Sequence, residues 1–177
     1  MTARIAVVSV TFGVLQLGLA FTGVSSLPLP TGLNVTLLAL PATLAGVLGG
    51  PIAGAIVGAI FGTTSVVLAT TPLFQNPVIA ILPRVLVGPA AAAGLQVTKR
   101  RGLPLALAAA GALGAATNTG LVLVLATLIT SPIGAPYLPP DAAFDIARTN
   151  LPAEVVVAGV VTIAVGLAAR ALGAMRA

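Results

Sequence analysis

The feature that most constrains this chain is the length of its uncharged stretches. No Asp, Glu, Lys or Arg occurs between Ile5 and Pro83, or between Gly102 and Pro140. Each stretch is longer than the roughly 20 apolar residues that cross a bilayer as a helix. Because lipid offers no partners to backbone N–H and C=O groups, such stretches have to form helices. The mean hydropathy of +1.17 agrees, and the chain is predicted to be an all-α integral membrane protein.

Clusters of Pro, Gly, Ser, Thr and Asn divide the chain into six apolar segments. Proline at the first position of a helix costs no hydrogen bond, so Pro51, Pro104 and Pro152 are each expected to start a helix. Asn150 is a candidate cap for the last of them. The prediction is a single domain, residues 1–177, with spans at about residues 4–22, 33–48, 51–69, 77–97, 104–130 and 152–174.

The basic residues give the expected orientation, because cytoplasmic loops retain Lys and Arg. With both termini inside the cell, only Arg148 falls in an outer loop, at about residues 131–149, and Arg84 falls within a span. The other basic residues all lie on the cytoplasmic side: Arg4, Lys99, Arg100, Arg101, Arg170 and Arg176. The N- and C-termini are therefore predicted to be cytoplasmic.

Arg84 is the residue that fits a lipid environment least well. A rise of about 1.5 Å per residue places it roughly 10 Å below the outer face. Charge at that depth is costly and by default marks a ligand site or a pathway. Pro83 and Pro89 lie in the same span and predict a kink or a broken helix. The alternative is that Arg84 is structural, and caps carbonyls freed by the prolines or extends toward the outer surface.

Further polar residues are predicted to lie near the same depth, at one face of the protein. Each has a structural alternative, either an interhelical hydrogen bond or a helix cap near the dipole. Their convergence predicts a pocket that opens outward and binds a small polar solute. The candidate substrate-binding residues are Arg84, Asn118, Thr119, Asn34, Gln75, Asn76 and Glu154, with Thr36 beside Asn34.

Small residues at four-residue spacing indicate close helix packing. From the end of the second span through the third, Gly46, Gly50, Gly54, Gly58 and Gly62 follow this spacing and predict a packing seam. On the first span Ser9 and Gly13, with Ala6, form a similar pattern. That pattern is interpreted either as internal packing or as a surface for another membrane protein.

The residue types that are missing exclude several functions. The chain has no Cys and no His, so it lacks thiolate nucleophiles, imidazole bases and the usual ligands of zinc, copper and haem. No GxxxxGK[ST] phosphate-binding loop occurs, and all acidic residues lie between Asp141 and Glu154. No catalytic residue, metal site or cofactor is predicted. The chain is expected to bind a solute and to take its driving energy from elsewhere.

Several motifs carry a family resemblance. They are Pro72-Leu73-Phe74-Gln75-Asn76-Pro77, Ile81-Leu82-Pro83-Arg84-Val85-Leu86-Val87-Gly88, Thr117-Asn118-Thr119 and the turn Gly50-Pro51-Ile52-Ala53-Gly54. Together they resemble the substrate-binding membrane subunits (S components) of energy-coupling factor (ECF) vitamin importers, which are not enzymes themselves.

The resemblance implies a multi-pass subunit in a prokaryotic plasma membrane that binds a vitamin near its outer face. It also implies a transmembrane coupling protein and two cytoplasmic ATPase subunits as partners, and no nucleic acid. In the family the first helix carries an Ala-xxx-Ala surface for the coupling protein, and Ser9-xxx-Gly13 is the nearest match. The subunit is expected to topple in the membrane to release its solute inward.

The substrate is predicted from the side chains that could recognise it. The chain has no Trp and one Tyr, Tyr137, whereas planar vitamins favour aromatic stacking. Pantothenate is flexible and carries a carboxylate that could pair with Arg84. The Gln-Asn-Pro and Pro-Arg motifs resemble the pantothenate and riboflavin branch. Pantothenate is the predicted substrate, riboflavin or another vitamin precursor is the alternative, and a solitary secondary transporter or membrane scaffold is the alternative of another class.

Overall fold

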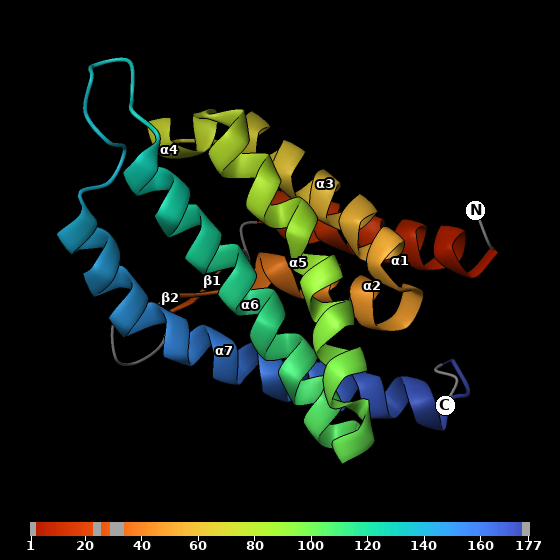
Figure 1. Ribbon diagram of the computed structural model, residues 1–177. Coiled ribbons are helices and arrows are strands. Elements are labelled where there is room, and N and C mark those ends of the chain that lie inside the picture. The colour runs from red at the N-terminus through yellow and green to blue at the C-terminus, as the bar shows by residue number, and fades with distance from the viewer. Residues whose placement is uncertain (1–2, 23–25, 29–33, 175–177) are drawn as a thin grey trace.

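A computed structural model describes residues 3–22, 26–28 and 34–174 of the chain. Arg176 and the side chain of Asn34 lie outside the described residues. Within these residues the fold is mainly helical and contains a short antiparallel ribbon, in which Ser26 pairs with Thr36 (Figure 1). The elements in order are α1 (Ala3–Phe21), β1 (Ser26–Pro28), β2 (Asn34–Thr36), the 3-10 turn η1 (Leu37–Ala39), α2 (Leu40–Gly49), α3 (Pro51–Val67), α4 (Pro72–Gln75), α5 (Pro77–Thr98), the 3-10 turn η2 (Lys99–Arg101), α6 (Leu103–Leu128) and α7 (Pro140–Ala171).

Length and hydropathy make four of these helices candidates to cross a membrane: α1, α5 with η2, α6 and α7. The apolar helices over Leu37–Gly49 and Pro51–Val67 are shorter. The prediction of a helical membrane protein is therefore confirmed. Each expected span contains a helix, and the seventh α-helix among the described residues is the single turn α4, which precedes α5.

Helix α2 lies at the centre of the fold. It contacts α1, α3, α5, α6 and α7, and every side chain from Pro41 to Val47 is buried. On one side of α2 an apolar cluster joins Ala42 to Val57 of α3 and Val87 of α5, and on the other side Val47 packs with residues of α5 and α6. Alanines make up half of the buried residues in each cluster, and these small side chains allow the short helix to lie close to its neighbours.

The glycine seam packs α3 against α5. A Cβ atom at Gly54 would lie 2.5 Å from the Cα atom of Gly88, and one at Gly62 would lie 2.7 Å from the Cα atom of Ile81. A Cβ atom at Gly58 would overlap the carbonyl oxygen of Arg84. These glycines allow the two backbones to touch, as the spacing predicts.

Gly50 has a different role from the other glycines of the predicted seam. A Cβ atom placed on it would meet no atom within 4 Å, so it makes no close helix contact. Its φ of 87° is in a region that L-residues rarely adopt, and it connects α2 to α3, which starts at Pro51. Gly50 is therefore a turn glycine and not a packing glycine.

The small residues of α1 face the interior of the chain. Ser9, Gly13 and Gln16 are its buried residues, and a Cβ atom at Gly13 would lie 2.9 Å from the Cδ1 atom of Ile60 in α3. Ala6 is half-buried. In this conformation Ser9 and Gly13 pack inside the chain and are not available on a surface, in contrast to the predicted partner interface.

The structure decides two predictions about prolines. Helix α5 runs continuously through Pro83 and Pro89, so of the two alternatives predicted for it, a kink or a broken helix, the break is excluded. The prediction that Pro152 starts a helix is wrong. Helix α7 does not start at Pro152 but at Pro140, so the expected outer loop is helical over its second half. Both Pro140 and Pro152 are compatible with a first helical position, and packing against α6 continues the helix through the second of them.

The two ends of the molecule differ in what they carry. In Figure 1 the N and C labels and the turn between α5 and α6 lie toward the right and bottom. Helix α4 and the connection from α6 to α7 lie at the opposite end, at the upper left. The basic turn η2 is therefore at the same end as both described chain ends.

Candidate functional site

A cavity of about 560 Å³ lies toward the end of the molecule that holds α4. Its volume is within the range of about 300–1,000 Å³ that is typical of small-molecule sites. Residues from α1, α3, α4, α5, α6 and α7 form its wall, and its polar members are Thr36, Thr64, Ser65, Thr70, Arg84, Asn118, Thr119, Asn150 and Glu154. The cavity thus brings together side chains from nearly the whole length of the chain.

Arg84 is the cationic group of the cavity wall. Its side chain is only 5% exposed. The guanidinium carbon lies 4.8 Å from the ring centre of Phe74 in α4 and 5.3 Å from that of Phe61 in α3. These distances are within the range of cation–π attraction, which strengthens when the cation is desolvated. The two aromatic rings therefore hold the charge at the cavity wall.

Arg84 also donates a hydrogen bond to a backbone carbonyl of its own helix that would otherwise have no partner. Pro83 has no N–H group, so the carbonyl of Ile79, four residues earlier, cannot accept the usual helical hydrogen bond. The Nη1 atom of Arg84 donates to that carbonyl at 2.7 Å. This is the capping role that was the alternative to ligand binding. The Nε atom is buried and has no partner within the described part of the chain, so the side chain is only partly satisfied.

Asn118, Thr119 and Glu154 form the acidic part of the wall, where α6 meets α7. The hydroxyl of Thr119 donates to the Oε2 atom of Glu154. Asn118 and Glu154 are 6% and 7% exposed, and the Oδ1 atom of Asn118 has no hydrogen-bond partner among the described residues. Glu154 lies in the interior of α7, so it is not the helix-start cap that was its structural alternative.

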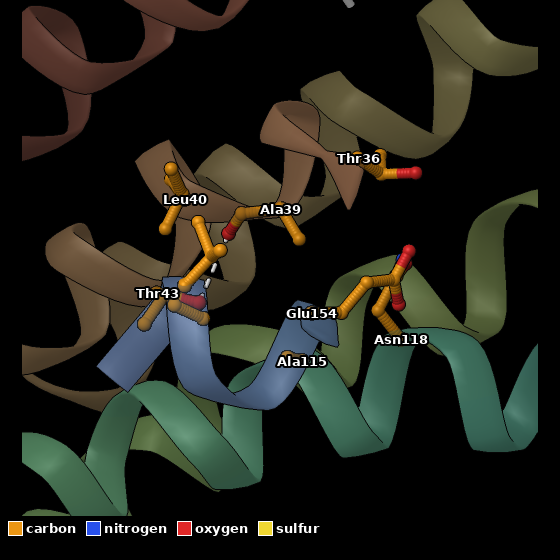
Figure 2. Close-up of a pocket in the computed structure, with 9 residues that line it drawn as sticks. Thr36, Ala39, Leu40, Thr43, Ala115, Asn118 and Glu154 are labelled. Atoms are coloured by element: carbon orange, nitrogen blue, oxygen red, sulfur yellow. Dashed lines mark hydrogen bonds between the residues drawn. The ribbon is translucent and has the colours of Figure 1, made fainter. Parts of the chain in front are cut away.

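A second, much smaller pocket adjoins the cavity (Figure 2). Its volume is about 10 Å³. Thr36, Asn118 and Glu154 line both spaces, whereas Thr43 of α2 lines only the small one. Figure 2 shows Asn118 and Glu154 at one end of this pocket and Thr43 at the other, with its hydroxyl bonded to the carbonyl of Ala39.

The remaining candidates lie elsewhere. Gln75 is exposed and does not line the cavity. Asn76 is the N-cap of α5, because its Oδ1 atom accepts hydrogen bonds from the backbone N–H groups of Val78 and Ile79 at 3.0 and 3.4 Å. Asn34 is part of β2, and its side chain lies outside the described residues. Of the predicted set, the cavity contains Arg84, Asn118, Thr119 and Glu154.

Sequence reasoning missed several residues of the wall. Asn150 was assigned to a helix cap, but it lies inside α7 and faces the cavity. The hydroxyls of Thr64 and Ser65 donate to carbonyls of their own helix. No pattern in the sequence indicates that these two residues also line the cavity. Phe61 and Phe74 were overlooked because aromatic residues do not stand out in an apolar chain. A search for aromatic residues near the lone buried arginine would have found Phe74 in the motif before Pro77.

The chain matches a model of a known protein family. A family model described as "ECF transporter, substrate-specific component" matches residues 2–172, which is nearly the whole chain. A comparison with curated proteins gives no match.

Proposed function

The chain belongs to the family of substrate-specific components of ECF transporters, and from this premise we propose that it binds pantothenate in the cavity beside Arg84. Proteins of this family are vitamin-type substrate-binding subunits of transporters and not enzymes. The observation that carries the proposal is that one cavity of suitable volume is lined both by a buried cation and by hydrogen-bonding side chains.

The chemistry of the wall suits a flexible anion. After its bond to Ile79, Arg84 keeps several N–H donors for a ligand carboxylate, which is the strong, charge-assisted kind of hydrogen bond. On the other side of the cavity Asn118, Asn150 and Glu154 offer acceptors to hydroxyl and amide groups. Pantothenate carries all three of these groups on one chain.

Riboflavin is the second candidate, because the cavity contains more aromatic surface than the sequence suggested. The scarcity of Trp and Tyr does not extend to phenylalanine, and both Phe61 and Phe74 line the cavity. Arg84 covers one face of each ring, which leaves other ring surface for a planar vitamin. A direct comparison of the two vitamins therefore decides between them.

We further propose that all six longer helices lie within the membrane, with both termini in the cytoplasm and the cavity toward the outside. The basic residues Arg4, Arg170 and η2 support this orientation, since they belong to the end away from α4. Helices α2 and α3 are short for a span, but α2 is enclosed by other helices and so has little contact with lipid. The cell is proposed to be prokaryotic, as the family resemblance implies.

The proposed partners are a transmembrane coupling protein and two cytoplasmic ATPase subunits. The absence of a phosphate-binding loop from the sequence supports an external energy source. Since Ser9 and Gly13 are buried against α3 in this conformation, we place the partner surface of α1 on its exposed side, at Val7, Val10 and Val14. These valines are close to two-thirds exposed.

Calorimetric titration of the purified protein with pantothenate and with riboflavin tests the substrate. We expect one pantothenate per chain, and we expect Asn150→Ala to weaken binding by roughly five- to tenfold, the effect of about one lost hydrogen bond. Gln75→Ala is the matched control, because this amide lies nearby but outside the cavity, and it should bind normally. Equal losses in both variants, or binding of riboflavin alone, would contradict the pantothenate assignment.

A further inference from the structure

Two side chains of opposite charge line the cavity without pairing with each other. Arg84 is 5% exposed and Glu154 is 7% exposed, and both belong to the cavity wall. Within the described ranges, the only ion pair joins Arg148 to Asp145 at 3.7 Å on the surface. A buried charge is costly unless a partner meets it. A ligand that spans the cavity can meet both charges, provided that its two ends differ in chemistry.

The carboxylate of Glu154 has one oxygen bound by the protein and one oxygen open. The hydroxyl of Thr119 donates to Oε2. The Oε1 atom accepts no hydrogen bond from the described residues, and it is not among the side-chain atoms that are both enclosed and unpartnered, so it contacts open space. In Figure 2 this carboxylate lies beside Asn118, at the end of the small pocket away from Thr43. Since Glu154 lines the cavity, Oε1 is available to a ligand there.

Helix α7 presents Glu154 on the face that forms the cavity wall. Ile146, Asn150 and Glu154 follow each other at four-residue spacing, which places them on one side of a helix, and all of them line the cavity. The other two acidic residues of the chain, Asp141 and Asp145, are in the same helix but are exposed and outside the cavity. Glu154 is therefore the acidic residue that a ligand in the cavity meets.

We propose that Glu154 is a specificity-determining residue, which selects ligands that are uncharged at the end remote from Arg84. It accepts a hydrogen bond from a hydroxyl at that end, because an ionised carboxylate can only accept. It excludes ligands with a second anionic group there, such as a phosphate ester of the same hydroxyl. This inference rests on the proposed binding of pantothenate, with the ligand carboxylate toward Arg84.

The charges of the wall explain why a phosphate ester would be excluded. Arg84 and Glu154 are the charged residues that line the cavity, and together they are neutral. The carboxylate of the vitamin adds one negative charge, which Arg84 faces. A phosphate monoester adds about −1.5 to −2 further charges at pH 7, next to the carboxylate of Glu154 and without a second cation. Like charges brought together in a site that excludes water are strongly unfavourable.

Three ligands test the proposal on the unmodified protein by calorimetric titration. They are pantothenate, pantothenate phosphorylated on its primary hydroxyl, and pantothenate acetylated on the same hydroxyl. The acetyl ester should bind roughly five- to tenfold more weakly than pantothenate, the effect of about one lost hydrogen bond. The phosphate ester should bind at least roughly a hundredfold more weakly than pantothenate. Equal affinities for the two esters would show that charge has no role, and the proposal would be wrong.

Two variants assign the discrimination to Glu154. Glu154→Gln keeps the shape of the side chain and removes its charge, so the phosphate ester should bind within about tenfold of pantothenate. Asp141→Asn is the matched control, since it removes a carboxylate of α7 that lies outside the cavity, and it should discriminate like the parent. Undiminished discrimination in a folded Glu154→Gln protein would overturn the proposal. Melting temperatures without ligand show whether each variant is folded, and the comparison of ligands on the parent needs no variant.

Failure of this inference differs from failure of the proposed function. A parent protein that binds pantothenate and its phosphate ester equally well would keep the proposed function and exclude the role of Glu154. A parent protein that binds no pantothenate would overturn both.

Discussion

At the scale of single residues, Arg84 has two roles that must be separated. Its Nη1 atom caps the carbonyl that Pro83 leaves unbonded, and its side chain also lines the cavity. Replacing it therefore removes a helix contact and a proposed ligand contact at once. Because Pro83 is the reason that this carbonyl lacks a backbone partner, replacing Pro83 removes the need for the Arg84 cap.

We predict that Arg84→Ala lowers the free energy of unfolding by about 1–3 kcal/mol, because the buried carbonyl of Ile79 loses its partner. In a Pro83→Ala background, the new N–H group can bond to that carbonyl, so the same replacement should cost at least about 1 kcal/mol less. The four proteins of this cycle can be compared by thermal unfolding without ligand.

Binding should behave differently from stability in the same cycle. Loss of the arginine should weaken pantothenate binding by roughly ten- to a hundredfold in both backgrounds, since the ligand contact does not depend on Pro83. Arg84→Lys should recover binding only in part, because lysine lacks the planar fork. If Arg84→Ala destabilises the protein but binds pantothenate normally, the arginine is purely structural.

Charge and polarity located part of the wall from sequence, and aromatic residues were the main omission. Arg84, Asn118 and Glu154 are polar or charged residues within apolar spans. Because burying such groups in a membrane is costly, their positions in the sequence identify them as candidate site residues. Phe61 and Phe74 have no such contrast, although they flank the arginine. Their role depends on how α3 and α4 approach α5, which spacing along one helix does not determine.

At the scale of helices, the contact between α3 and α5 supports the cavity wall. Gly58 touches the carbonyl of Arg84, and Phe61, one turn further along α3, reaches the guanidinium of the same residue. The seam therefore holds the aromatic ring and the cation at their observed separation. A larger residue in the seam has to move one of them.

We predict that Gly58→Ala destabilises the protein by about 1–3 kcal/mol or more, because its Cβ atom would overlap backbone that has no rotamer to change. Gly18→Ala in α1 is the control. A Cβ atom there meets nothing within 4 Å, and alanine favours helix by about 0.5–1 kcal/mol. Chemical or thermal unfolding of both variants checks this, and a neutral Gly58→Ala would refute the close packing.

The sequence predicted where a helix starts only if a single proline marked the start of the apolar segment. Pro51 and Pro77 start helices as expected, since each follows a clear break in the apolar pattern. In the last segment Pro140 and Pro152 carry the same local signal, and only the contacts of α7 with α6 select the earlier one. That choice places Asn150 and Glu154 within a helix, where both line the cavity.

At the scale of the whole molecule, the proposed function separates binding from transport. In sealed vesicles the protein alone should bind pantothenate up to one per chain and accumulate none inside, because its sequence has no phosphate-binding loop. Addition of the coupling protein, the two ATPases and ATP should start uptake. Radiolabelled pantothenate retained on filters measures both quantities. Uptake driven by an ion gradient without those partners would identify a secondary transporter instead.

The cavity wall runs from Ala20 in α1 to Glu154 in α7, with α2 enclosed between them. During synthesis the early helices leave the ribosome well before the last one exists. Until α7 arrives, Thr119 lacks its partner Glu154, and α2 is open along one side. A nascent chain can therefore be inserted in the membrane and largely helical, yet unable to hold its ligand until its final helix is made.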